Sequence, residues 1–169
     1  MSTLFVDTIN EKTSGNGVAI PGHVVQYQGL ASWGSTKAQS SSSWTNAETV
    51  SITPKFSNSK ILFCFNFMSR LRGTASNEQR GGWRVIRSTD NFSTSTTVFN
   101  TVDSVETQHI GQSHTEFDTM MMVSGIDEPG VATEVKYRIQ GKIHSSNTTW
   151  IEFIPSTFGG QVFCMEIAQ

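Results

Sequence analysis

Lys60-Ile-Leu-Phe-Cys-Phe-Asn-Phe-Met-Ser-Arg70 is the stretch of sequence that decides the fold. It carries a bulky apolar residue at every second position: Ile61, Phe63, Phe65 and Phe67. This two-residue period is that of a β-strand with one face toward a core. The other face is also mostly apolar. Such a strand is typical of the centre of a sandwich, or of a surface that a neighbouring subunit covers.

Similar alternation recurs along the chain in both directions. We expect further strands at residues 24–30, 50–53, 83–87, 96–102, 115–123, 134–143, 150–154 and 161–167. Turn-rich segments separate them, Ser and Thr are abundant, and good helix formers are scarce. Residues 31–46 are polar and are expected to form a surface loop. The pattern predicts an all-β chain that folds as an antiparallel β-sandwich.

Composition narrows the functional classes. The chain has 169 residues, a net charge of −2 and 15% charged residues. Its length suits one domain. Its charge argues against nucleic-acid binding, and no apolar run is long enough for membrane insertion. Cys64 and Cys164 each lie in an apolar run, which favours two buried free thiols, although spacing alone leaves a disulfide open.

The first 25 residues form an expected extended arm ahead of a β domain at residues 26–169. They show neither helix signals nor the basic and apolar regions of a signal peptide. We expect this N-terminal arm to hold a sister chain or a larger assembly. Its apolar residues are the candidate docking contacts: Leu4, Val6, Ile9, Val18 and Ile20.

No pattern predicts an enzyme or a cofactor. Nucleophile elbows and phosphate-binding loops are absent from the sequence. His114, Glu116 and Asp118 share one face of an expected strand, but methionines continue that face. We therefore interpret these three residues as a solvated or interface surface and predict no metal site.

Tryptophans and methionines supply the candidate binding residues. Trp83 and Trp150 fall within strand patterns and are expected in the core, whereas Trp33 and Trp44 lie in the expected loop and are candidate receptor contacts. Consecutive methionines on a strand place apolar groups on both of its faces, and one face then needs a cover. We expect that cover to be a sister subunit. The candidate interface residues are Met68, Met120, Met122 and Phe163.

Several short motifs follow one another in a recognisable order. They are Leu4-Phe-Val-Asp-Thr-Ile-Asn, Ser14-Gly-Asn-Gly-Val, Ile20-Pro-Gly-His-Val-Val-Gln, Ile52-Thr-Pro-Lys, Ser59-Lys-Ile-Leu, Asp127-Glu-Pro-Gly, Val135-Lys-Tyr-Arg-Ile-Gln and Met165-Glu-Ile. In this order the chain resembles small virion structural and tail-fibre proteins of marine bacteriophages, including cyanophage-like ones. The resemblance implies a jelly roll similar to the complement and tumour-necrosis-factor type, which assembles as a trimer.

The resemblance and the residues together predict a non-enzymatic virion protein, assembled in the host cytoplasm. The preferred role is a trimeric tail fibre or fibre tip that attaches to the host surface. Its partners would be two sister copies, other phage structural proteins and a host-surface glycan. A capsid (head) decoration or cement protein of the same fold is the alternative, and a carbohydrate-binding lectin-like module is a further one.

Overall fold

The alternating phenylalanine stretch forms β4 (Lys60–Gly73), the strand around which one sheet is built. The computed structural model describes residues 20–29, 36–73, 79–101, 105–107, 116–144, 148–154 and 160–169. The expected inward face of β4 is confirmed, because Ile61, Phe63, Phe65 and Phe67 are all 0% exposed. The described residues form strands and loops. Among them there is no helix long and apolar enough to cross a membrane.

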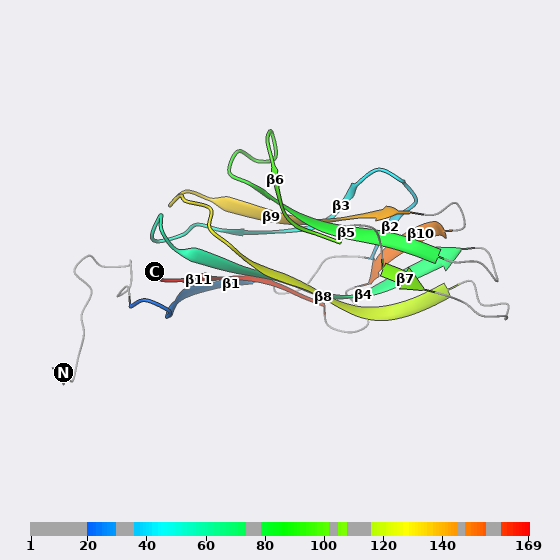
Figure 1. The fold of residues 1–169 in the computed structure, drawn as a ribbon, viewed down its shortest axis with the longest axis horizontal. Coiled ribbons are helices and arrows are strands. Elements are labelled where there is room, and N and C mark those ends of the chain that lie inside the picture. Colours follow the sequence, from blue (N-terminus) through cyan, green and yellow to red (C-terminus); the bar gives the residue numbers. More distant parts are fainter. Residues whose placement is uncertain are drawn as a thin grey trace.

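Two antiparallel sheets pack against each other (Figure 1). The strands of the first sheet are β1 (Val24–Gly29), β2 (Lys37–Gln39), β4, β8 (Glu116–Asp127), β10 (Thr148–Ile154) and β11 (Gln161–Ile167). Those of the second sheet are β3 (Thr45–Ile52), β5 (Gln79–Ser88), β6 (Thr96–Asn100), β7 (Val105–Thr107) and β9 (Val135–Ile143). The expected antiparallel β-sandwich is therefore correct.

Several strands are collinear pieces of one longer strand. Along one edge of β4, β11 pairs with residues 60–66 and β10 with residues 68–73, while β8 pairs along the opposite edge. In the same way, β1 and β2 continue each other beside β11 and β10, and β6 and β7 continue each other beside β5. The eleven segments therefore make eight strands.

The eight strands pair in a nested order. The first strand (β1 and β2) pairs with the last (β10 and β11), β3 pairs with β9, β4 with β8, and β5 with β6 and β7. This is the order of a jelly roll, in which eight strands form two antiparallel sheets.

The core lies between the sheets. The ring of Phe63 stacks on that of Tyr137 at 5.3 Å, and Phe67 packs on Phe153 at 5.0 Å. Gly141 makes room for this packing, because a Cβ atom there would lie 2.7 Å from the Phe153 ring. Trp83 is 1% exposed, as expected for a core residue.

Two carboxylates are built into the fold. Asp127 accepts hydrogen bonds from Arg87 Nη1 at 2.9 Å and from Tyr137 Oη at 2.8 Å, which joins β8 to both β5 and β9. Glu166 on β11 is 0% exposed. It accepts hydrogen bonds from the backbone N–H groups of Lys55 and Phe56, at 2.9 and 3.0 Å, so it fixes the segment that links β3 to β4.

The two cysteines are free and buried, which confirms the favoured interpretation. They lie on neighbouring strands but face opposite ways, since Cys64 is paired with Phe163 and Cys164 with Phe63. Burial raises the pKa of Cys64, and burial followed by the charge of Cys64 raises the pKa of Cys164 to about 12. Both thiols are therefore held in the unreactive protonated form at neutral pH.

We predict that a disulfide reagent at pH 8 labels both cysteines when the protein is unfolded in urea. In the same time it should label neither cysteine of the folded protein. Because the folded pKa of each thiol lies above the unfolded value, their contribution to stability is full below about pH 8.5. It is lost as the pH rises toward 12, the folded pKa of Cys164. Rapid labelling of one thiol in the folded protein would contradict the observed burial.

The structure corrects one detail of the sequence interpretation. Residues 31–46 were expected to form one loop, but β2 lies within this segment and β3 already begins at Thr45. The short β2 has no clear alternation to reveal it, and its position depends on pairing with the distant β10. The first sheet begins at Val24, where the expected strand at residues 24–30 also begins.

Candidate functional site: two regions on the outer face of the first sheet

Five of the six exposed large hydrophobic residues in the described part of the chain lie on the outer face of the first sheet. Directly opposed residues of an antiparallel pair share a face, so the register identifies the residues that point outward. The exposed members are Val24, Tyr27, Met120, Met122 and Ile126. We call these five residues the apolar patch. Among the described residues, the one other large hydrophobic with comparable exposure is Ile20, at 36%.

Methionine dominates the most exposed part of the patch. Met122 is 69% exposed and Met120 55%, and both project from β8 at an edge of the sheet. Tyr27, at 59%, lies across the sheet on β1. A set of exposed large apolar residues gathered on one sheet face often marks a contact with another molecule.

The candidate interface residues fall into two groups. Met120 and Met122 are open to solvent, as an interface with a sister copy requires. Phe163 is half-buried, with its ring 5.6 Å from that of Tyr27. Met68 differs from the expectation, because it lies between β10 and β8 and is only 6% exposed. It therefore has little area to offer a partner.

A cluster of charged side chains occupies the other end of the same face. Arg70 forms a two-pronged pair with Asp118, at 2.6 and 2.9 Å, and Arg72 Nε lies 2.7 Å from Glu116. The hydrogen bond from Arg70 lowers the pKa of Asp118. Glu116 and Asp118 are thus neutralised by arginines. His114 lies outside the described residues, and no described group of three or more metal-binding side chains gathers here or elsewhere.

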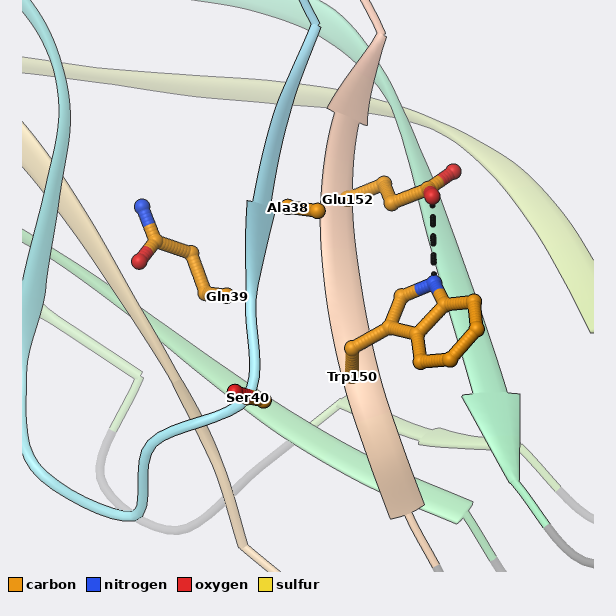
Figure 2. Close-up of a pocket in the computed structure, with 5 residues that line it drawn as sticks. All are labelled: Ala38, Gln39, Ser40, Trp150 and Glu152. Atoms are coloured by element: carbon orange, nitrogen blue, oxygen red, sulfur yellow. Dashed lines mark hydrogen bonds between the residues drawn. The ribbon is translucent and has the colours of Figure 1, made fainter.

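Beside this cluster, β2 and β10 border a hollow of about 280 Å³, lined by Ala38, Gln39, Ser40, Trp150 and Glu152 (Figure 2). Figure 2 shows the side chains of Trp150 and Glu152 on the same side of β10, whereas Gln39 points away from them. Ala38, directly opposite Glu152, is too small to fill the space. We call this space the β2–β10 hollow.

Trp150 corrects an expectation, since it was predicted to lie in the core but is half-buried on the outer face. Its indole N–H donates to Glu152 Oε1 at 3.0 Å, and the Arg72 guanidinium lies 4.8 Å from its ring centre. The hollow thus combines an aromatic ring with a carboxylate acceptor. A site for a single sugar ring uses both kinds of group. The volume of the hollow is at the lower limit of small-molecule sites.

The remaining candidate residues are divided between described and undescribed parts of the chain. Trp44 is half-buried on the outer face of the second sheet, where a Cβ atom added to Gly82 would lie 3.3 Å from its ring. Ile20 is exposed at the start of the described chain. Trp33 and the arm residues Leu4, Val6, Ile9 and Val18 lie outside the described residues.

Comparison with known proteins gives no relative that bears on function. No family model and no curated protein matches this chain. Among solved structures, the chain is similar to dimeric latent PorU from Porphyromonas gingivalis, with a TM-score of 0.37 and 8% identity. The match covers 90% of this chain and 14% of that one. A likeness of this degree carries no argument about fold or function.

Proposed function

We propose that this chain is a non-enzymatic bacteriophage virion protein, a homotrimeric tail-fibre or fibre-tip component that attaches the particle to its host. The observation that carries the proposal is the apolar patch, whose five exposed side chains all lie on one sheet face. A sister copy of the same chain is the cover we propose for it. The ordered sequence motifs that resemble marine phage virion proteins support the same assignment.

A trimer suits attachment for a physical reason. Three linked copies engage a repetitive surface with a high effective concentration, so weak single contacts combine into firm binding. With the first sheet turned toward sister copies, the loops and the second sheet remain free to meet the host. The virion would be the site of action, and assembly would take place in the host cytoplasm.

Light scattering on the purified chain tests this proposal. We expect a mass three times the 18.6 kDa of one chain. A shortened chain that begins at Ile20 should also give three times its own chain mass, because it retains β1 and the whole apolar patch. A trimer that needs residues 1–19 would place the contacts in the arm instead. A monomer in both cases would contradict the proposed assembly.

A head decoration protein of the same fold is the alternative for the same molecule. It would use the arm to lie along the capsid lattice, and it would stabilise the particle without binding the host. Antibody labelling of intact particles separates the two, since one location is on the tail and the other on the head.

The β2–β10 hollow favours a second candidate function, that of a lectin-like module. Its indole and carboxylate are suited to one sugar ring. Binding of a neutral monosaccharide that is abolished by Trp150→Ala, in a protein that remains a monomer, would favour this function over the virion role.

A further inference from the structure

The outer face of the second sheet differs in charge from that of the first. Basic residues alternate along β9, at Lys136, Arg138 and Lys142, and Arg84 projects beside them from β5, opposite Gln140. We call these four side chains the cationic row. Alternate residues of a strand point to one face and lie about 7 Å apart, so the row runs along roughly 20 Å of the sheet.

Most of this positive charge is not neutralised. Among the described residues, Glu134 is the one carboxylate in an ion pair with the row, at 3.4 Å from Lys136 Nζ and with its own side chain 54% exposed. Arg84 instead donates to Gln140 Oε1 at 2.6 Å, and Arg138 to Thr49 Oγ1 at 3.0 Å. Partial burial lowers the pKa of both arginines, as expected for cations held without a carboxylate.

The other carboxylates near this face are used within the fold. Asp90 accepts hydrogen bonds from Ser88 and from Thr94, and so holds the turn between β5 and β6. Glu48 on β3 accepts from the backbone N–H of Thr49. On the first sheet, by contrast, Arg70, Arg72 and Lys60 all have carboxylate partners. Of the two outer sheet faces, the second is therefore the one with an excess of unpaired positive charge.

Aromatic rings are interleaved with the row. The ring of Trp44 lies 4.7 Å from both the Arg84 guanidinium and the Lys142 ammonium. The Arg138 guanidinium lies 3.5 Å from the ring centre of Phe92. Phe92 has a positive φ of 67°, which is costly for a bulky residue, and the preceding Asn91 has a φ of 57°, which asparagine tolerates. The turn thus bears strain in the conformation that places Phe92 against the row.

We infer that the cationic row binds a linear anionic polysaccharide, one that carries sulfate or carboxylate groups along its length. The regular spacing of the cations matches a polymer with repeated charges, and the rings offer apolar surfaces to sugar C–H groups. Nucleic acid carries the same kind of repeated charge, and the proposed host-attachment role is what favours a polysaccharide over it. This inference rests on the proposed function, since it names the class of receptor that a host-attachment protein would bind.

The test measures binding of the full-length protein to dextran sulfate and to uncharged dextran of equal length at ~50 mM salt. We expect binding to dextran sulfate alone, weakening steeply as salt is added. The double substitution Lys136→Gln and Lys142→Gln should weaken it about tenfold or more, because two of the cations along the polymer are lost. Arg138→Gln should weaken binding in the same direction.

A matched control removes the same charge elsewhere. Lys55→Gln with Lys60→Gln, outside the row, should leave affinity within about twofold, as expected if the local row and not net charge governs binding. Equal losses in the two double variants, equal binding to uncharged dextran, or no binding at all would overturn the inference. Tighter binding to single-stranded DNA of the same charge would overturn the assignment to a polysaccharide.

Mass measured on the same samples separates the two proposals. A trimer that fails to bind dextran sulfate would overturn the cationic row as a receptor site and leave the virion assembly standing. A monomer that binds it through Lys136 and Lys142 would support the row and overturn the trimeric attachment role. Unfolding curves of each variant show whether a loss of binding reflects a loss of fold.

Discussion

Met122→Asp is expected to convert the trimer into monomers at micromolar concentration. Met122 is 69% exposed within one chain, so a carboxylate there is solvated when the chain is alone. In the proposed interface the same carboxylate would be buried against apolar side chains of a sister copy. Such burial without a partner costs several kcal/mol, and the cost is repeated in each subunit.

Met122 is a cleaner test than Met120. Met122 lies opposite Asn66 on β4, whereas Met120 is closer along β8 to the pairing of Arg70 with Asp118. Met120 lies beside this charged cluster, where a sister copy would meet a less apolar surface, so we expect Met120→Asp to act in the same direction but less strongly.

The control for this prediction carries the same charge on the other sheet. Thr97 is exposed on β6, opposite Ile86 on the outer face, so Thr97→Asp should keep the mass of the wild-type protein. Light scattering gives the mass, and urea unfolding shows that the monomeric variant is still folded. An unchanged mass for Met122→Asp would show that the apolar patch is not the subunit contact.

Glu166→Ala is expected to lower the free energy of unfolding by about 3–5 kcal/mol. Glu166 is 0% exposed and accepts hydrogen bonds from the N–H groups of Lys55 and Phe56 and from Gln26 Nε2, the last at 2.7 Å. Alanine would remove this acceptor from the two backbone N–H groups, leave Gln26 Nε2 with the Thr53 carbonyl as its acceptor, and open a cavity beside β1. Both effects act on the folded state.

Urea denaturation measures this loss, and two further variants define its origin. Glu166→Gln keeps the volume and one acceptor oxygen, so its loss should be smaller than that of alanine. Glu134→Ala removes a carboxylate whose side chain is 54% exposed, and it should change stability by no more than about 0.5 kcal/mol. A loss for Glu166→Ala as small as that of the control would show that its hydrogen bonds contribute little.

The sequence predicted the sandwich because its strongest pattern belongs to the central strand. The two-residue period of Phe63, Phe65 and Phe67 predicts that these side chains are buried, as they are. The strand β11 was also predicted with its observed bounds, Gln161–Ile167. Short segments with weak alternation were less predictable. β7 (Val105–Thr107) lies outside any expected strand, since its position depends on pairing with β5.

The candidate sites were predictable only where one strand carries the signal. Met120 and Met122 are two positions apart on one strand, so the sequence alone predicts that they share a face, and both are exposed there. The cationic row needs two strands, because Arg84 lies 54 positions before Arg138 and reaches it only through the pairing of β5 with β9. Trp44 was expected in a loop, and its contact with Lys142 depends on the same sheet. Long-range pairing of this kind leaves no local pattern in a sequence.

The nested pairing of the jelly roll has a consequence for biosynthesis. Translation releases β5 and β6 close together in time, so this central hairpin can form early. Each outer pair must wait longer, and Val24 meets its partner Ile167 only after the ribosome has made almost the whole described chain. The apolar face of β4 stays exposed on the nascent chain until strands of the second sheet emerge, since Phe63 packs on Tyr137 of β9. This topology therefore sets a delay in folding, during which the most apolar strand is exposed to aggregation.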